Sequence, residues 1–332
     1  MSRPRPEPPA EVVALAHERS AARAARDWPR ADALRAAIEA AGWRVVDRGT
    51  DVALEPAAPP TIEEDGLVRY GSAADVPSVL GEPPSARFTV ELVADDWHDD
   101  LARTLAGLRA HAPAGTHVVV VANAPSAGQA ARLAPGSPDL APIAGAPPEV
   151  VRTSVRLGHA AARNVGLRRA RGAIVVLASS SVEPTGDPLT PLEAVLADPA
   201  VAVAGPIAFV TPDLRRFAAA PGAAADTIGL AWLAFRREDV AALGPIDEKL
   251  VLPDHLGTWW SLALRVGAEP GAGPRAARNV ALPLAVHEER PPAGIPDAER
   301  DRLAKRAFYR VLDRFRERRD LLSGPAPGTR PA

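Results

Sequence analysis

The stretch from Gly158 to Pro184, GHAAARNVGLRRARGAIVVLASSSVEP, constrains the fold of this chain more than any other part of the sequence. Its first half, Ala160 to Ala170, has the composition of a helix, and Gly172 ends that helix. Ala173 to Leu177 is then a short apolar run, typical of a buried strand. In an α/β sheet, ligands bind beyond the carboxyl ends of the strands. The polar turn Ala178 to Ser181 is therefore the expected place for chemistry, and it contains no acidic residue.

The composition limits the classes of protein to which this chain can belong. Its 332 residues suffice for one large domain with an appendage, and its formal net charge of -2 gives no general attraction to nucleic acid or membranes. The chain has no cysteine, which excludes disulfides, cysteine nucleophiles and cysteine-based zinc sites. It shows neither a secretory signal pattern nor an apolar run that could span a bilayer, so we expect a cytoplasmic protein.

Apolar runs and helical periodicities alternate through the middle of the chain. The predicted strands are Phe88–Val93, His117–Val121, Val150–Val155, Ala173–Leu177 and Val201–Ile207. The predicted helices between them are Trp97–Ala110, Ala160–Ala170 and Pro191–Ala197. Such alternation predicts the α/β class, as a three-layer sandwich with a mainly parallel sheet.

The second half of the chain is less regular. Gly229–Phe235 is predicted as an edge strand and Val280–Leu284 as a last strand, with the helices Arg237–Leu243 and Thr258–Val266 between them. Asp297 is expected to cap a long amphipathic helix that runs to Leu322.

The beginning of the chain has a pattern of its own. Two helices, Glu11–Arg26 and Arg30–Ala41, precede two short strands, Trp43–Val46 and Val52–Leu54. The segment HERSAARAARDWPRADALRAAIEAAGWRVVDRGTDVALEP resembles the extreme C-terminal helical segment of cysteinyl-tRNA synthetases. The resemblance is carried by the Arg-rich first helix, the Asp27-Trp28 corner, Ala31-Asp32 with Leu34-Arg35, and the exit from Gly42 to Asp47. It implies RNA as a candidate partner, and the alternative is a helical hairpin used only for packing.

These patterns predict five parts in the chain. A helical hairpin module covers residues 1–55, and a linker with at most one short strand, near Leu67–Tyr70, covers residues 56–86. The main domain covers residues 87–295, the amphipathic helix residues 296–322, and a disordered tail residues 323–332.

The main domain resembles family 2 glycosyltransferases of the GT-A fold over roughly residues 87 to 290. The matching elements are Phe88–Val93, Val118–Ser126, Gly158 with Ala162-Arg163-Asn164, Gly166-Leu167, Ala170, Gly172, Gly205, Phe235-Arg236-Arg237 and Gly244-Pro245-Ile246-Asp247-Glu248. The resemblance implies transfer of a sugar from a nucleoside diphosphate donor to an acceptor.

The sequence departs from the family at the position where a divalent cation is held. Members normally carry an Asp-x-Asp motif after the central strand, and its carboxylates hold Mn²⁺ or Mg²⁺. Here the motif is degenerate, because Ala178, Ser179, Ser180 and Ser181 occupy these positions and hydroxyls are poor ligands for such cations. No metal ligand is predicted, and the three serines are instead candidates for donor binding. Glu183 and Asp187 are the next carboxylates downstream.

The same resemblance indicates other residues around the donor. It places Asp95, Asn123, Arg163 and Asn164 near the nucleotide, and the last two are expected to brace its loop. Asn123 stands where the family often has an acidic pair, and its amide can hydrogen-bond a base edge. An alternative role for Asp95 is to cap the helix that follows it.

The catalytic base is expected a few residues beyond Asp247-Glu248. Either Asp254 or His255 can take a proton from an acceptor hydroxyl. The alternative is that Asp254 caps the helix that carries Trp259 and that His255 is an ordinary loop residue. His287 falls near the position where some GT-A enzymes present a third metal ligand.

Three functions remain open from the sequence. The first is an active transferase that displaces the nucleotide directly with the help of a base. The second is a glycosyltransferase-like protein that has lost metal-dependent catalysis and serves as a binding or scaffold module. The third is an RNA-associated protein in which the N-terminal hairpin delivers the larger domain to RNA. Fold is shared by all three and does not choose among them.

Overall fold

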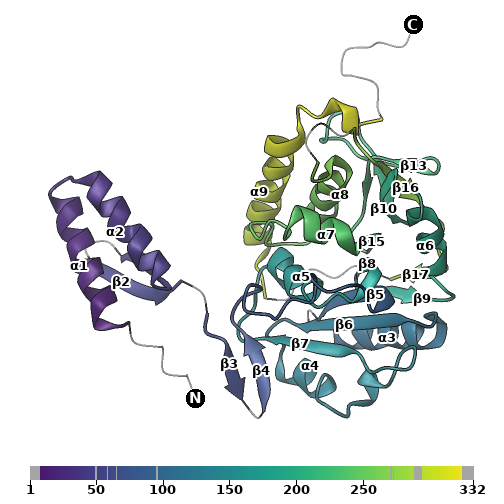
Figure 1. Ribbon diagram of the computed structural model, residues 1–332, viewed down its shortest axis with the longest axis horizontal. Coiled ribbons are helices and arrows are strands. Elements are labelled where there is room, and N and C mark those ends of the chain that lie inside the picture. The colour runs from purple at the N-terminus through teal and green to yellow at the C-terminus, as the bar shows by residue number, and fades with distance from the viewer. Residues whose placement is uncertain are drawn as a thin grey trace, which may run out of the picture. The chain divides into compact units, whose positions relative to one another are not determined.

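The computed structural model describes residues 8–48, 51–57, 59–64, 66–94, 96–269, 271, 273–287 and 294–323. The chain divides into two compact units, Met1–Ser72 and Ala73–Ala332, and Figure 1 labels most of their elements. This boundary lies inside the stretch expected as a linker. At most one strand was expected in that stretch, but Ile62–Glu64 and Leu67–Tyr70 form an antiparallel pair. The part from Ala73 onward belongs to the larger unit, where Arg168 and Arg237 donate hydrogen bonds to the carbonyls of Val76 and Glu82.

The smaller unit contains two helices and two hairpins: α1 Ala10–Ala24, α2 Trp28–Ala40, the antiparallel pair β1 Trp43–Arg48 and β2 Asp51–Pro56, and the antiparallel pair β3 Ile62–Glu64 and β4 Leu67–Tyr70. The side chain of Asp27 caps α2 by accepting a hydrogen bond from Arg30 N at 3.2 Å, and a proline stands in the first turn, which lacks intrahelical acceptors for its N–H groups. Val12, Ala16, Ile38 and Trp43 form its apolar core.

The central sheet of the larger unit has the strand order β13-β16-β10-β15-β8-β5-β6-β7. Its strands are β5 Ala86–Ala94, β6 Thr116–Ala122, β7 Glu149–Thr153, β8 Gly172–Ala178, β10 Val201–Gly205, β13 Ala224–Ala225, β15 Trp232–Arg236 and β16 Ala276–Asn279. The pairs β5–β6, β5–β8, β6–β7 and β10–β16 are parallel, and β15 runs antiparallel to both of its neighbours. The sheet is therefore mainly parallel, as predicted.

Shorter elements complete the larger unit. The helices are α3 His98–His111, α4 Ala127–Arg132, α5 His159–Leu167, α6 Thr190–Leu196, α7 Arg237–Leu243, α8 Leu256–Val266 and α9 Asp297–Phe315, with 3-10 turns at Pro138–Leu140 and Arg319–Leu321. The small strands are β9 Val182–Pro184, β11 Ala208–Val210, β12 Ala218–Ala219, β14 Thr227–Ile228 and β17 Leu284–Val286.

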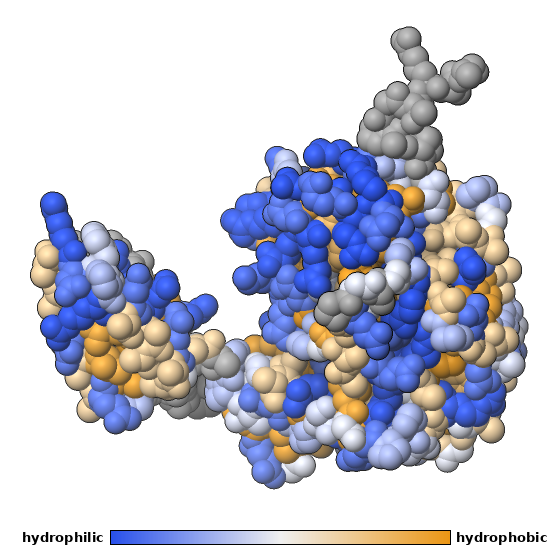
Figure 2. Space-filling view, turned by 45° about the horizontal axis from the view of Figure 1, so that its top comes forward, coloured by the Kyte–Doolittle hydropathy of each residue, from blue (hydrophilic) through white to orange (hydrophobic). Residues whose placement is uncertain are grey.

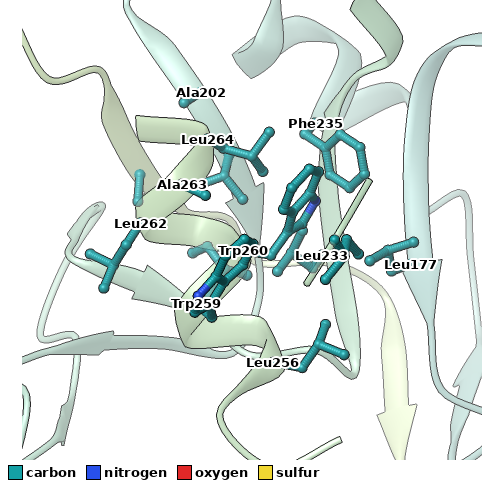
Figure 3. Close-up of a cluster of buried hydrophobic side chains, with 14 of the residues drawn as sticks. Leu177, Ala202, Leu233, Phe235, Leu256, Trp259, Trp260, Leu262, Ala263 and Leu264 are labelled. Atoms are coloured by element: carbon teal, nitrogen blue, oxygen red, sulfur yellow. The ribbon is translucent and has the colours of Figure 1, made fainter. Parts of the chain in front are cut away.

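Two apolar cores lie on opposite faces of the sheet, because successive side chains of a strand point to opposite faces. In β8, Val175 and Leu177 belong to the core shared with α5, α7, α8 and α9, whereas Ile174 and Val176 belong to the core shared with α3 and α6. Figure 3 shows the α8 side of the first core, where Trp260 lies beside Leu233 and Phe235. The three-layer α/β sandwich is thereby confirmed.

The basic helix α9 packs its apolar side on the same core. Its buried side chains are Ala307, Val311, Leu312 and Phe315. Figure 2 shows a mainly hydrophilic surface on the part of the larger unit where α9 lies. This arrangement matches the amphipathic pattern of the sequence.

Three details of the sequence prediction are wrong. Gly229–Phe235 was expected at a sheet edge, but β15 lies between β8 and β10, and burial of Trp232 through Phe235 on both faces agrees with an interior strand. Val280–Leu284 is not one strand, because β16 ends at Asn279 and the chain pairs again only from Leu284 in β17.

The third error concerns the C-terminal helix. Asp297 is its first residue and not its cap, since Pro296 precedes it without a side-chain cap bond, and α9 ends at Phe315. The helix ends early because Leu321 turns back, and its carbonyl accepts a hydrogen bond of 2.6 Å from Arg265. The first residue of the predicted tail, Ser323, is held in place, because its backbone N–H donates a hydrogen bond of 2.8 Å to Asp226 Oδ1. Residues 324–332 lie outside the described residues.

Candidate active site

The ends of three parallel strands meet at one edge of the sheet. Ala94 at the end of β5 is in register with Ala122 at the end of β6, and Ala178 at the end of β8 is in register with Leu92. The loops that follow these strands contain most of the residues proposed from the sequence. This edge is the place where an α/β sheet binds ligands.

The loop after β5 is tied to the loop after β6. Asp96 has a left-handed backbone, with φ of 67°, and its Oδ1 accepts a hydrogen bond from Ser126 N at 2.7 Å. Its Oδ2 accepts a hydrogen bond from Arg156. Burial raises the pKa of Asp96, but the hydrogen bonds from Ser126 and Arg156 lower it by more. The pKa of Asp96 is therefore below its ordinary value. Asp95, the residue proposed from the sequence, lies outside the described residues.

Asn123, directly after β6, is buried and bonded to the backbone of a neighbouring loop. Its Nδ2 donates to Leu157 O at 3.0 Å, and its Oδ1 accepts from Leu157 N at 2.8 Å. The hydroxyl of Thr153 lies 3.3 Å from the same Oδ1. The amide therefore holds the segment that leads from β7 into α5.

Arg163 of α5 joins the middle of β5 to the end of β8. Its Nη1 donates to Glu91 Oε2 at 2.7 Å and to Glu91 O at 3.1 Å, and its Nη2 donates to Ala178 O at 3.0 Å. Its Nε lies 3.2 Å from His159 Nε2, which accepts that hydrogen bond. Burial, and then the charge of Arg163, lower the pKa of His159 well below its ordinary value, so this imidazole is neutral. Through these contacts Arg163 fixes α5 against β5 and β8.

Asn164 holds the loop that leads toward Asp254 and His255. Its Nδ2 donates to Ile246 O at 2.9 Å and to Glu248 Oε1 at 3.1 Å, while its Oδ1 accepts from Ile246 N at 2.9 Å. Because the amide is buried and its hydrogen bonds go to that loop, Asn164 fixes the position of the loop.

The serine turn after β8 is rigidly hydrogen-bonded. Ser179 Oγ and Ser181 Oγ are 2.8 Å apart, and Ser179 N donates to Ala231 O at 2.8 Å. The hydroxyl of Thr104, from α3, lies 2.9 Å from Ser180 O. The three serines thus form a fixed polar turn at the carboxyl end of the central strand.

Glu183 and His287 meet beside this turn. The strands β9 and β17 pair antiparallel with Glu183 opposite Ala285, and Glu183 Oε2 lies 2.8 Å from His287 Nε2. His287 N also donates to Ser181 O at 2.8 Å. No local sequence pattern predicts this contact, because the two residues are 104 positions apart.

Asp254 and His255 precede α8. Asp254 is exposed, and His255 is the N-cap residue, with φ of 59° and no side-chain cap hydrogen bond. The His255 ring packs at 5.5 Å from the ring of Phe308 in α9. Burial lowers the pKa of His255, against an opposing effect of Asp254, so the net pKa is below its ordinary value.

The beginning of α8 also touches the connection between β14 and β15. A Cβ at Gly257 would lie 2.7 Å from Leu230 N, and the next residue, Ala231, accepts the hydrogen bond from Ser179 N. The start of α8 and the serine turn therefore both contact the connection between β14 and β15.

Comparison with known proteins agrees with this architecture. The GalNAc-T7 structure with UDP, GalNAc and Mn²⁺ aligns with a TM-score of 0.53 at 15% identity, over 69% of this chain and 48% of that chain. The larger unit has the GT-A fold. A mannosyltransferase from Pyrobaculum calidifontis, in complex with GDP-Man and Mn²⁺, aligns with a TM-score of 0.49 at 21% identity, over 76% of this chain and 68% of that chain.

One curated protein matches a short part of the chain. The cysteine–tRNA ligase of Opitutus terrae is 56% identical over 54 residues, which are 16% of this chain and 12% of the ligase. The resemblance to cysteinyl-tRNA synthetases is confirmed for that short segment. No protein-family model matches the chain.

The GT-A unit does not fit a cation held by carboxylates at the end of β8. The hydroxyls of Ser179 and Ser181 hydrogen-bond to each other, and Glu183, the next carboxylate along the chain, pairs with His287. Among the described residues, no three His, Cys, Asp or Glu side chains are grouped so that they could hold a metal ion. Neutral serine hydroxyls, with a carboxylate and an imidazole that already pair with each other, are a poor set of ligands for Mn²⁺ or Mg²⁺. Within the residues that the structure describes, no helix is both long enough and apolar enough to cross a bilayer.

Proposed function

We propose that the GT-A unit binds a nucleoside diphosphate sugar at the carboxyl edge of β5, β6 and β8 and transfers the sugar to an acceptor hydroxyl. The observation that carries this proposal is the register of the strand ends, which gathers the loops after Ala94, Ala122 and Ala178 at one edge. The likeness in fold to a UDP-binding transferase supports it.

The residues divide into those that face the donor and those that hold its loops. Asp95 and the serine turn Ser179–Ser181 are proposed to face the donor. The side chains of Arg163, Asn164 and Asn123 hydrogen-bond to the protein backbone. We assign Arg163 and Asn123 to positioning the nucleotide loop and Asn164 to positioning the acceptor loop.

The transfer is a direct displacement at the anomeric carbon. The acceptor oxygen forms a bond to that carbon while the bond to the diphosphate oxygen breaks, and the nucleoside diphosphate leaves with the electron pair. The acceptor proton passes to His255 or Asp254. The lowered pKa of His255 keeps its imidazole neutral at physiological pH, as a base requires.

The first test is a calorimetric titration of the full chain with UDP and GDP, with and without Mn²⁺. Binding of either nucleotide is expected, and absence of binding of both would contradict the proposal. The second test follows hydrolysis of UDP- and GDP-sugars, with water as the acceptor. His255→Gln and Asp254→Asn should separate the two candidate bases, and His111→Gln, at the exposed end of α3, is the matched control.

Nucleotide binding without turnover in any of these assays would favour the scaffold function. That outcome leaves the binding half of the proposal standing and removes the transfer step.

A second candidate function is RNA binding by the smaller unit. The 56% identity of a short segment to a cysteine–tRNA ligase is the observation that favours it. Fluorescence anisotropy of a labelled tRNA should then rise on addition of the full chain and fall steeply with added salt. The double variant Arg30→Gln/Arg35→Gln in α2 should weaken the binding, while Arg302→Gln in α9 should not.

A further inference from the structure

We propose that Arg310 of α9 is a positioning residue for the transfer, because it fixes the acceptor loop, residues 246–255, on which both candidate bases lie. Its Nε donates a hydrogen bond of 2.6 Å to Asp247 Oδ2, at the start of this loop. The inference rests on the proposed function, since the position of the loop matters to the reaction only if Asp254 or His255 takes the acceptor proton.

Both carboxylate oxygens of Asp247 accept a hydrogen bond. Oδ1 accepts from Lys249 N at 3.0 Å, and Oδ2 accepts from Arg310. The carbonyl of Asp247 accepts a further hydrogen bond of 3.0 Å from Leu250 N. Burial raises the pKa of Asp247, but the hydrogen bonds from Arg310 and Lys249 lower it by more, so the carboxylate is charged at neutral pH. Arg310 therefore fixes the orientation of the carboxylate that closes this turn.

The helix α9 also contacts the other end of the acceptor loop, where the ring of Phe308 packs 5.5 Å from the ring of His255. Between these two contacts the loop is attached to α5, because His159 N donates to Val251 O at 2.8 Å. This attachment does not depend on α9, so loss of Arg310 should shift the start of the loop without unfolding all of it.

The pair of Arg310 and Asp247 should matter more to the reaction than to folding. Its side chains are 35% and 27% exposed, and ion pairs that water reaches contribute little to stability. The helix is instead attached to the core by its buried apolar side chains, Ala307, Val311, Leu312 and Phe315. Rates of group transfer, by contrast, depend steeply on geometry, and a displacement of about 1 Å can lower a rate roughly a hundredfold.

The test measures hydrolysis of UDP-glucose and GDP-mannose by the full chain, with water as the acceptor. Arg310→Met should lower kcat about tenfold or more, while KM and the calorimetric affinities for UDP and GDP stay within about twofold. Arg310→Lys keeps a cation and should lose less. The double variant Asp247→Asn/Arg310→Met should be no slower than the slower of its two single variants, because both remove the same contact. Arg306→Gln, at an exposed position of the same helix, is the control and should keep the wild-type rate.

Hydrogen exchange gives a second measurement, which does not depend on turnover. In Arg310→Met the backbone amide of Lys249 should exchange about fivefold faster or more, since the carboxylate to which it donates is no longer held. The amides of α8 should keep their wild-type exchange rates. Unchanged exchange at Lys249 would contradict the inference.

A wild-type kcat in Arg310→Met would overturn the inference while leaving the proposed function intact. It would also be overturned by an equal loss in Arg310→Lys, by an equal loss of nucleotide affinity, or by a fall of the urea midpoint that accounts for the lost activity. If the wild-type chain hydrolyses neither sugar nucleotide, the proposed transfer step and this inference fall together.

Discussion

The guanidinium of Arg163 donates a hydrogen bond of 2.7 Å to the carboxylate of Glu91, and both side chains are buried. The same guanidinium also donates to Ala178 O, the last carbonyl of β8, at 3.0 Å. One side chain on α5 therefore connects the middle of β5 with the end of β8. The position of the serine turn depends on this connection.

Removal of Arg163 should be strongly destabilising. Arg163→Met leaves Glu91 without its cation in the interior, and breaking a buried pair costs about 3–5 kcal/mol. The double variant Glu91→Gln/Arg163→Met removes the uncompensated charge and should recover part of the loss. Urea denaturation measures both. Arg302→Gln, in an exposed pair with Glu299, is the control and should change the midpoint little. Equal effects of the buried and exposed arginines would show that the brace is unimportant.

Gly172 should not tolerate a side chain. A Cβ there would lie 2.1 Å from Phe88 C and 2.3 Å from Thr89 N, which are backbone atoms of the paired strand β5. Gly172→Ala must therefore push β8 from β5, and we expect a loss of at least about 3 kcal/mol or an insoluble protein. Gly128→Ala in α4 is the matched control, because nothing lies within 4 Å of its added Cβ. That variant should be neutral or slightly more stable. Soluble yield and urea midpoints measure the difference.

Asn164→Ala should loosen the loop from Ile246 to Glu248. The backbone N–H and C=O of Ile246 both lose their partner in a buried place, at a cost of about 1–3 kcal/mol. Thermal denaturation measures the stability, and nucleotide-sugar hydrolysis should fall more than nucleotide binding, because the loop leads to the candidate base. Asn279→Ala, whose side chain donates to Gly222 O at an exposed site, should cost less. An unchanged hydrolysis rate in Asn164→Ala would separate this loop from the reaction.

Stability should fall on acidification through His159. Its pKa in the folded chain is well below the ordinary 6.5, so the unfolded chain binds the proton more tightly. The unfolding free energy therefore decreases as the pH falls below about 6.5, because a protonated His159 can no longer accept from Arg163 and would repel it. Urea midpoints at about pH 7.5 and about pH 5 should differ less in His159→Gln than in the wild type. His111→Gln should keep the wild-type difference, and an unaltered pH dependence in His159→Gln would contradict this assignment.

The sequence alone was sufficient for the parallel strands at the centre of the main domain. Val118 to Val121 and Ile174 to Leu177 are continuous apolar runs, and such runs form strands that are buried on both faces whatever surrounds them. Gly158 is the N-cap of α5, as its place before the helix indicated, whereas Gly172, predicted to end that helix, is the first residue of β8, because α5 already ends at Leu167. These signals are local, so they can be recognised in the sequence without the tertiary structure.

Strand order and side-chain partners were decided by the tertiary structure. The run before Arg236 reads equally well as an edge or an interior strand, and only pairing of β15 with both β8 and β10 distinguishes them. The sequence shows an asparagine at position 123 but does not show whether its amide binds a ligand or the backbone of Leu157, as it does in the structure. The contact between Glu183 and His287 depends on two short strands far apart in the chain. Local periodicity determines which segments become helices or strands, but contacts between distant segments form only when the whole sheet is assembled.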